Sequence, residues 1–418
     1  MRSDRYSRLR VLLTVAALML LAAASTARAG VNWVVRGHGF GHGVGVSQYG
    51  AYGYALHGKD YRFILAHYYQ GSSIGQVEGA KVVRVLLDIS AGDIGFSAAT
   101  SACGVALDPA RSYEAHRDGT RVKLRSSAGK PLADCGTKLR AAGKGKIVIA
   151  GIGTYRGALE MVPTESEAGS LNVINALPVE QYVKGVIPNE SPPSWPAAEL
   201  RAQAVESRSF ALTAGVGGNG FDLYDDTRSQ VYDGLSSETA TTNAATEATR
   251  GQVVTYGGKI AETYFSACSG GYTESVQNVF FGPAIPYLTG VPDPYDYYCP
   301  LHDWTLKFSG PEISAKLGGY LDGKLKQVVI TKRGVSPRIV AAKLIGTGGV
   351  TKVSGEQLEV ALGAYSTWMS FQKVAGPARR PVRATRSSRG RRGDRCWPGR
   401  PPRSRQCRAG GRRARGRS

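Results

Sequence analysis

The chain has 418 residues and a formal net charge of +21, and most of this charge lies near its two ends. The segment 374–418 has sixteen Arg and one Asp, and the segment 1–29 has five Arg and one Asp, which leaves a net charge of +2 on residues 30–373. A near-neutral segment of this length is long enough for one large or two medium domains with hydrophobic cores. Its charge gives no reason to expect specific binding of nucleic acid.

The first 29 residues have the pattern of a secretory signal peptide. Four Arg precede or open an apolar run at 11–24, and Ala27-Arg28-Ala29 forms a small-residue cleavage site. The apolar run is shorter than the roughly 20 residues of a membrane span, and no basic cluster follows it. A transmembrane anchor is the alternative. We expect an exported protein that keeps no stable membrane span after cleavage.

Residues 30–75 are rich in Gly, His and Tyr, and we expect them to pack on the core. A strand is predicted at Val31–Val35, and the run GHGFGHG follows at 37–43. Four glycines in seven residues exclude a stable helix and predict a loop. One or two short helices are predicted after the loop, at Val46–Leu56 and Phe63–Tyr69.

The glycine-rich loop has several interpretations. His38 and His42 have the spacing of two metal ligands on a helix, but the glycines argue against a helix and no Glu lies between them, so no metal site is expected. A dinucleotide-binding loop is disfavoured because the bulky Phe40 interrupts the glycine pattern. The functional interpretation is a loop that lines a groove for a sugar polymer, and a structural turn is the alternative. The sugar-binding side chains would be those of His42, Ser47, Gln48 and Tyr49.

Residues 76–170 are predicted to form a β-rich subdomain, because short β-type runs at 82–87, 121–124 and 146–149 alternate with turn residues. In an exported protein, two neighbouring pairs of cysteines predict disulfides, and of the three possible connectivities we expect Cys103–Cys135 and Cys268–Cys299. A thiolate nucleophile or a zinc site is disfavoured because no Cys-x-x-Cys spacing is present.

Residues 171–373 are predicted to form a mixed core. A strand at 171–175 precedes two helices that begin with proline, at 178–186 and 196–214, and a stiff proline-rich linker joins the helices. A helix at 239–249 and a hairpin of 252–256 with 261–265 follow. The expected fold class is α+β, with a β-rich unit, a mixed α/β catalytic-type core and a groove between them.

Glu190 is the strongest candidate for catalysis. It is a lone carboxyl in a linker of Pro, Ile, Ser and Trp residues, and its nearest acidic neighbours in the sequence are Glu180 and Glu199. Desolvation on such a linker raises the pKa of a carboxyl, as a general acid near neutral pH requires. The alternative is that Glu190 caps the turn before the second helix.

Three other polar groups are candidates. Arg208 lies among small residues of the second helix, together with Gln203, and is expected to reach a cleft as a charge clamp; a surface arginine is the alternative. Gln230 and Tyr232 belong to a polar run with one aromatic residue, which is typical of a sugar-lining surface or of a plain loop. A nucleophilic role of Ser269 is disfavoured because the spacing of a nucleophile elbow is missing.

The Arg-rich tail at 374–418 has almost no aliphatic residues and is expected to be disordered. It either binds anionic wall polymers or results from a misread reading frame. It contains the remaining two cysteines, Cys396 and Cys407.

Four segments taken together resemble the SpoIID/LytB family, which comprises stage II sporulation protein D and the amidase enhancer. Their sequences include GHGFGHGVGVSQYGA, LNVINALPVEQYVKGVIPNESPPSWP, DTRSQVYDG and YFSACSGGYTES. The similarity spans most of residues 30–373, and the tail resembles nothing. The segments lie at 37–71, 171–212, 226–234 and 264–275.

The resemblance implies an extracytoplasmic, cell-wall-associated protein. The sporulation members are lytic transglycosylases that cleave glycan strands stripped of stem peptides. Their catalytic glutamate matches Glu190, and a cleft arginine matches Arg208. The enhancer branch implies instead a wall-binding module that assists a cell-wall amidase. Some relatives carry zinc; no matching ligand cluster is recognised here, and we expect no cofactor.

One departure from the family pattern concerns chain order. In the sporulation members the GHG…SQYGA segment lies near the C-terminus, whereas here it comes first. A fold whose termini meet tolerates such a permutation. The expected organisation is a signal peptide at 1–29, the GHG segment at 30–75, the β-rich subdomain at 76–170, a SpoIID-type core at 171–373 and the tail at 374–418.

Overall fold

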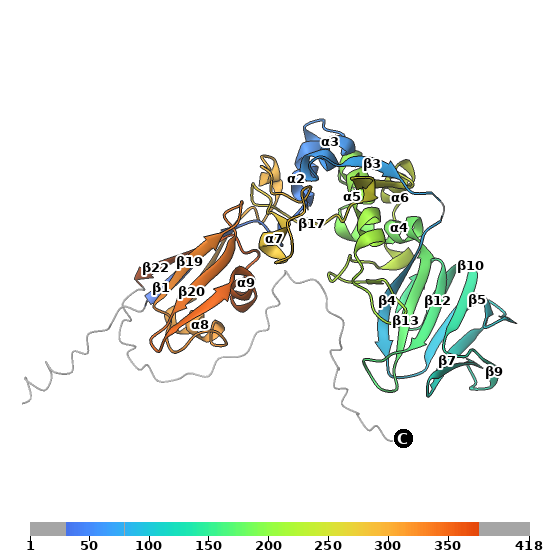
Figure 1. The fold of residues 1–418 in the computed structure, drawn as a ribbon. Helices are drawn as coiled ribbons and strands as arrows, with labels where there is room; N and C mark the ends of the chain where they lie inside the picture. Colours follow the sequence, from blue (N-terminus) through green and yellow to red (C-terminus); the bar gives the residue numbers. More distant parts are fainter. Residues whose placement is uncertain (1–30, 79, 376–418) are drawn as a thin grey trace, which may run out of the picture. The chain divides into compact units, whose positions relative to one another are not determined.

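The computed structural model describes residues 31–78 and 80–375, which form an α+β fold (Figure 1). The expected fold class is therefore confirmed. The predicted signal peptide, and the Arg-rich tail from residue 376 on, lie outside the described residues. In the part of the chain that the structure describes, no helix is both long and apolar enough to cross a membrane.

One large sheet contains most of the β-rich region. Its strands pair antiparallel, except for the parallel pair of β14 and β4. In β8, Val122 and Leu124 are buried and alternate with more exposed basic residues, which is the pattern of a sheet with one covered face. The order is β14 (Leu223–Tyr224), β4 (Val82–Ser90), β13 (Leu171–Pro178), β12 (Ala158–Pro163), β10 (Leu139–Ile149), β5 (Ile94–Ala102), β7 (Ser112–Asp118), β8 (Arg121–Ser126) and β9 (Pro131–Asp134), with β6 (Val105–Ala106) on β5 and β11 (Gly153–Tyr155) on β10.

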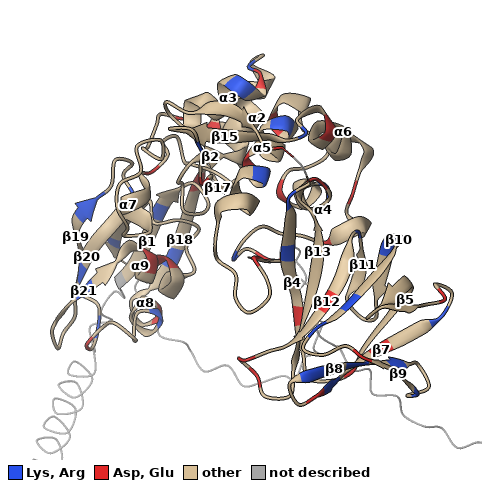
Figure 2. Ribbon diagram, turned by 45° about the vertical axis from the view of Figure 1, so that its right-hand side comes forward, with Lys and Arg blue, Asp and Glu red and all other residues tan. Residues whose placement is uncertain are grey.

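The Cys103–Cys135 disulfide predicted from the sequence is present in this region. It joins the residues that directly follow β5 and β9. On neighbouring strands, basic and acidic side chains pair, as in Arg121–Asp134 at 2.9 Å. Both signs of charge are spread along the ribbon (Figure 2), consistent with the small net charge of this part of the chain.

Helices from two separate parts of the chain pack around α5. Helix α5 is buried on nearly all sides and contacts α2, α3, α4, α6 and β15. Its small residues Ala202, Ala204 and Ala211 allow these neighbours to approach closely. The elements are α2 (Gln48–Leu56), α3 (Tyr61–Tyr68), α4 (Val179–Glu190), α5 (Ala197–Thr213), η1 (Gly234–Ser236) and α6 (Ala240–Ala248), with a small sheet of β16 (Lys259–Ile260), β15 (Gln252–Tyr256) and β3 (Ser73–Gln76).

The predicted glycine-rich loop is confirmed. Gly39, Gly41 and Gly43 have positive φ angles, which side chains with a Cβ rarely adopt. At Gly43, an added Cβ would lie 2.3 Å from the guanidinium carbon of Arg338, so close packing also requires glycine there. After the loop, β2 (Val46–Ser47) pairs in parallel with β17 (Phe265–Ser266).

The first described strand pairs with two strands from the C-terminal part of the described chain. β1 (Val31–His38) lies between β18 (Asp303–Ser309) and β22 (Met369–Ala375). Serine caps at Ser309 and Ser354 start two helices there, each with a complete capping box. The other elements are α7 (Val276–Val279), η2 (Asp296–Tyr298), α8 (Gly310–Lys316), β19 (Gln327–Arg333), β20 (Ile339–Ile345), β21 (Val350–Ser354) and α9 (Gly355–Leu362).

Two predicted elements need correction. Helix α4 does not end near Val186; it includes Pro188 and ends at Glu190, so Glu190 is the last residue of a helix and not part of a linker. The expected hairpin partner of β15 is also wrong. β15 pairs with the short strand β16 before Ala261, whereas Phe265 belongs to β17 and pairs with β2.

Candidate functional site

Glu190 is held at the C-terminal end of α4 by two groups that are distant in the sequence. Its Oε1 accepts a hydrogen bond from the backbone N–H of Val231 at 2.8 Å. The Gln48 side chain donates to the Glu190 backbone oxygen at 3.1 Å and lies 3.4 Å from Oε2. Burial raises the pKa of Glu190, and the bonds from Val231 and Gln48 act against this rise. The carboxyl is therefore partly dry and has a fixed orientation.

Gln48 connects Glu190 to the second helix. Its Nε2 also lies 3.3 Å from Oε1 of Gln203, a buried residue of α5. Gln203 in turn donates to Ser207 at 3.1 Å. Three candidates from the sequence, Gln48, Glu190 and Gln203, are therefore brought together in one hydrogen-bonded group.

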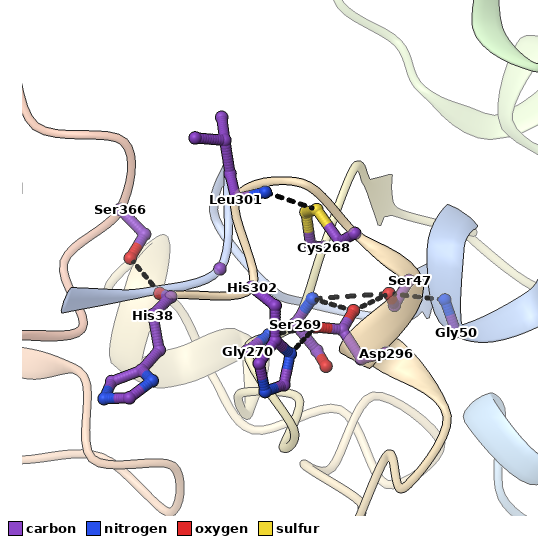
Figure 3. The surroundings of a disulfide bond; sticks show 12 residues. His38, Ser47, Gly50, Cys268, Ser269, Gly270, Asp296, Leu301, His302 and Ser366 are labelled. Atoms are coloured by element: carbon purple, nitrogen blue, oxygen red, sulfur yellow. Dashed lines mark hydrogen bonds and ion pairs between the residues drawn. A yellow bond between two sulfur atoms is a disulfide. The ribbon is translucent and has the colours of Figure 1, made fainter. Parts of the chain in front are cut away.

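Ser47 fixes the start of the helix that carries Gln48. Its hydroxyl accepts from the N–H of Gly50 as the N-cap of α2 and donates to Asp296 at 2.7 Å (Figure 3). Asp296 is fully buried and also accepts from the N–H groups of Ser269 and Gly270. The role of Ser47 in the structure is thus to hold α2, since the residue is itself buried.

The second predicted disulfide, Cys268–Cys299, closes this network (Figure 3). Cys268 precedes Ser269, and Cys299 follows η2, which begins with Asp296. His302 donates to or accepts from Asp296 across 2.8 Å. The disulfide therefore links the segment of Ser269 to the segment of Asp296, and Asp296 in turn accepts the hydrogen bond from Ser47.

Helix α5 also contains two buried acids that the sequence interpretation did not select. Glu199 accepts a 2.7 Å hydrogen bond from Ser191, the residue after Glu190, and burial raises its pKa to about 8. Glu206 accepts from Tyr69 at 3.1 Å, and burial followed by the charge of Glu199 raises its pKa well above the usual range. The sequence could have indicated this pair. Seven residues correspond to about two helical turns, so Glu199 and Glu206 lie on the same face of the Ala-rich helix.

Arg208 is not beside Glu190. Its side chain is fully buried and forms a bidentate ion pair with Glu180, in the first turn of α4, at 2.9 and 2.8 Å. It also donates to the backbone oxygen of Gln252 at 2.9 Å. The expected position as a clamp in a cleft is therefore not observed; Arg208 joins α5 to the beginning of the helix that ends at Glu190.

Gln230 and Tyr232 are buried, in contrast to the sugar-lining surface expected for them. Tyr232 donates to Asn175 at 2.7 Å, and Gln230 accepts from Tyr182 at 3.2 Å. Between them lies Val231, whose N–H holds the Glu190 carboxyl. These two side chains fix the segment that orients the candidate acid.

The two remaining candidates differ in their environment. Burial and the nearby Arg338 lower the pKa of His42 to about 4, and its Nδ1 accepts from the N–H of Val44, so the ring is neutral. Tyr49 is half-buried, and its ring centroid lies 5.0 Å from that of Trp195. Of the two tyrosine candidates, Tyr49 is partly exposed, whereas Tyr232 is buried.

Comparison with known proteins shows which families the sequence of this site resembles. The family model described as "Stage II sporulation protein" matches residues 167–256, which include Glu190 and its partners on α5. The amidase enhancer of Bacillus subtilis is 33% identical over 211 residues, covering 44% of this chain and 28% of the relative. Stage II sporulation protein D of Bacillus amyloliquefaciens is 31% identical over 220 residues, covering 49% of this chain and 62% of the relative. Part of the chain is therefore similar to the SpoIID/LytB family.

The resemblance inferred from the motifs is confirmed. A third similar sequence, an uncharacterised protein of Brachyspira hyodysenteriae, is 38% identical over 169 residues and covers 40% of this chain and 45% of the relative. The chain thus spans between about a quarter and two thirds of the length of these relatives. Across residues 31–78 and 80–375, no group of three or more His, Cys, Asp or Glu side chains is arranged to hold a metal ion.

The raised pKa of Glu199 predicts a dependence of stability on pH. Because burial raises the pKa of Glu199 to about 8, the folded chain keeps this proton up to about pH 8, whereas the unfolded chain releases it at the ordinary glutamate pKa of about 4.5. Stability is therefore full below about pH 4.5 and falls as the pH rises towards 8. We expect Glu199→Gln to be more stable than the wild type by more than about 1 kcal/mol at pH 8, with a smaller difference at pH 5.

Thermal unfolding of the full chain at both pH values measures this effect. Glu165→Gln, an exposed substitution between β12 and β13, is the matched control, and its effect should not depend on pH. A stability difference between Glu199→Gln and wild type that is the same at pH 5 and pH 8 would contradict the assignment of a protonated Glu199.

Proposed function

We propose that this protein is exported and acts on the glycan strands of peptidoglycan as a lytic transglycosylase, with Glu190 as acid and base. The observation that carries the proposal is the partly dry Glu190 carboxyl, whose pKa is raised by burial and whose orientation is set by Val231 and Gln48. A general acid near neutral pH needs these two properties.

The reaction follows from one carboxyl acting twice. Protonated Glu190 donates its proton to the glycosidic oxygen, and the bond from that oxygen to C1 of the muramyl sugar breaks. The carboxylate then removes the proton from the 6-hydroxyl of the same sugar, and this oxygen closes the 1,6-anhydro ring. Most glycosidases need a second carboxylate to activate water or to form a covalent intermediate, and this route does not.

The two carboxyl oxygens have different environments that suit these steps. Oε1 accepts from the backbone of Val231 at 2.8 Å, so it is the anchored oxygen. Oε2 has only the longer 3.4 Å contact with the Gln48 amide, and it is the oxygen we assign to proton transfer. Glu199 is excluded as a direct participant because its side chain is buried against Ser191.

The other candidates support this carboxyl. We assign Arg208 a positioning role, because it fixes the first turn of α4 through Glu180 while Glu190 occupies the last turn. Gln203 positions Gln48, and Gln230 and Tyr232 position Val231. Tyr49 is the side chain we assign to sugar contact, while Ser47 and His42 stabilise α2 and the glycine-rich loop.

Product analysis tests the proposed reaction. The full chain is incubated with glycan strands stripped of stem peptides, and the released fragments are analysed by mass spectrometry. We expect 1,6-anhydro-muramyl ends, which have one water less than hydrolysis products. Reducing ends would show a hydrolase instead and overturn the transglycosylase assignment.

A second function has a specific observation in its favour, since one relative is named amidase enhancer. In that case the chain binds glycan strands, releases no fragment, and increases the activity of a cell-wall amidase added to the same reaction. The same incubation with and without an amidase separates the two functions.

A further inference from the structure

Five aromatic rings form a continuous row that begins at Tyr49, the residue after Gln48. Their consecutive centroid distances are 5.0, 4.8, 5.6 and 4.5 Å, each within the range of packed aromatic pairs. In order, the rings are Tyr49, Trp195, Tyr52, Tyr298 and Tyr297, and we call them the aromatic row.

The row is assembled from three separate segments of the chain. Tyr49 and Tyr52 lie on α2, Trp195 lies between α4 and α5, and Tyr297 and Tyr298 belong to η2. The segments meet because Gly53 lets α2 approach η2 closely: a Cβ at this position would lie 2.5 Å from Tyr295. The ring of Tyr295 also stacks on His57 of α2, with centroids 4.0 Å apart.

The row is accessible, although its members pack on one another. Tyr297 is 53% exposed and Tyr298 is 37% exposed, and the other three rings are half-buried. Contiguous exposed aromatic side chains on a soluble protein usually mark a binding site. The side chains of the row carry no formal charge, so they would contact the pyranose rings of a sugar polymer rather than its charged groups.

The position of the row identifies its ligand. Tyr49 directly follows Gln48, the residue that contacts Glu190, and Trp195 lies five residues after Glu190. Two members of the row are therefore close in sequence to groups of the Glu190 site, which favours a ligand that also binds at Glu190. The apolar faces of pyranose rings match aromatic faces, and tyrosine hydroxyls can bond to sugar hydroxyl and acetamido groups.

We propose that the aromatic row is a binding platform for the sugar units of a glycan strand that flank the bond held at Glu190. This inference rests on the proposed function, because it takes glycan as the ligand of the Glu190 site. It adds that Tyr52, Trp195, Tyr297 and Tyr298 select long strands over short fragments, whether or not the bond is cleaved.

The test uses Tyr298→Ser and Tyr297→Ser in the full chain, together with Tyr298→Phe, which keeps the ring. Tyr256→Ser is the matched control, because Tyr256 has the same exposed fraction of 37% and lies on β15, outside the row. Equal melting temperatures of Tyr298→Ser and Tyr256→Ser exclude a folding defect as the cause of any difference.

Two measurements are made, and only one of them requires catalysis. The first is binding of stripped glycan strands in the Glu190→Gln background, by co-sedimentation. We expect Tyr298→Ser to weaken binding about tenfold, with a larger effect for the double Ser variant and little effect for Tyr298→Phe or Tyr256→Ser. The second is cleavage, where KM should rise for long strands and kcat should stay nearly constant.

The outcomes test two hypotheses separately: that the aromatic row binds glycan, and that the Glu190 site cleaves it. If no variant cleaves glycan but Tyr298→Ser still weakens binding, the platform holds and the transglycosylase assignment fails. Unchanged glycan binding by the double Ser variant overturns the platform. It is also overturned if the variants retain glycan binding and lose only the stimulation of an amidase, because the row would then contact a protein.

Discussion

Replacing Glu190 with glutamine is expected to lower the rate of glycan-strand cleavage by at least about 100-fold, while the chain stays folded. The amide keeps an oxygen that can accept from Val231, so the local structure of α4 is retained. It has no acidic proton to give to the glycosidic oxygen and no negative charge to remove the proton of the 6-hydroxyl. Both half-steps are therefore lost together. Release of anhydro fragments over time measures the effect.

The exposed substitution Glu165→Gln is the control, and it should cleave at the wild-type rate. The pH profile adds a second criterion. Because burial raises the pKa of Glu190, the wild-type rate should fall on the alkaline side as the acid form disappears. Equal product from wild type and Glu190→Gln would remove this carboxyl from the mechanism.

Arg208→Ala is expected to destabilise the chain by about 3–5 kcal/mol, the largest stability effect we predict. The substitution leaves the Glu180 carboxylate without its bidentate partner in a mostly buried position. It also removes the donor to the backbone oxygen of Gln252. Thermal or denaturant unfolding measures the loss, which corresponds to a fall in melting temperature of roughly 10 °C.

Arg201→Ala on the exposed side of the same helix is the matched control, with an expected effect within about 0.5 kcal/mol. Replacing both partners, as in Arg208→Met with Glu180→Leu, should recover much of the stability because no buried charge is left unpaired. A variant Arg208→Ala with unchanged stability but weakened glycan binding would instead support the clamp expected from the sequence.

Local patterns were sufficient to predict most elements and part of the site. The alternation around Val122 and Leu124 predicts a strand, and the glycines at 37–43 exclude a helix, because both features act within a few residues. The two disulfides follow from cysteine pairs about 30 residues apart. Glu190 could be selected because it is a lone carboxyl among Pro, Ile, Ser and Trp residues in the sequence.

Contacts between distant residues could not be predicted in the same way. Pro188 normally predicts a helix end, but here the last turn of α4 is supported by Gln48, which donates to the Glu190 backbone oxygen from a helix 142 residues earlier in the chain. Arg208 was expected in a cleft because nothing in its local sequence indicates Glu180 as its partner. The burial of Glu199 depends in the same way on neighbours from other elements.

The place of β1 in the middle of its sheet constrains how the chain can fold during synthesis. Its residue His38 pairs with Asp303 on one side, and Gly37 pairs with Met369 on the other. Both edges of this first described strand are therefore covered only after nearly all the later described residues have been synthesised. A nascent chain stopped short of Met369 presents an open strand edge, the kind of surface through which incomplete chains associate with one another.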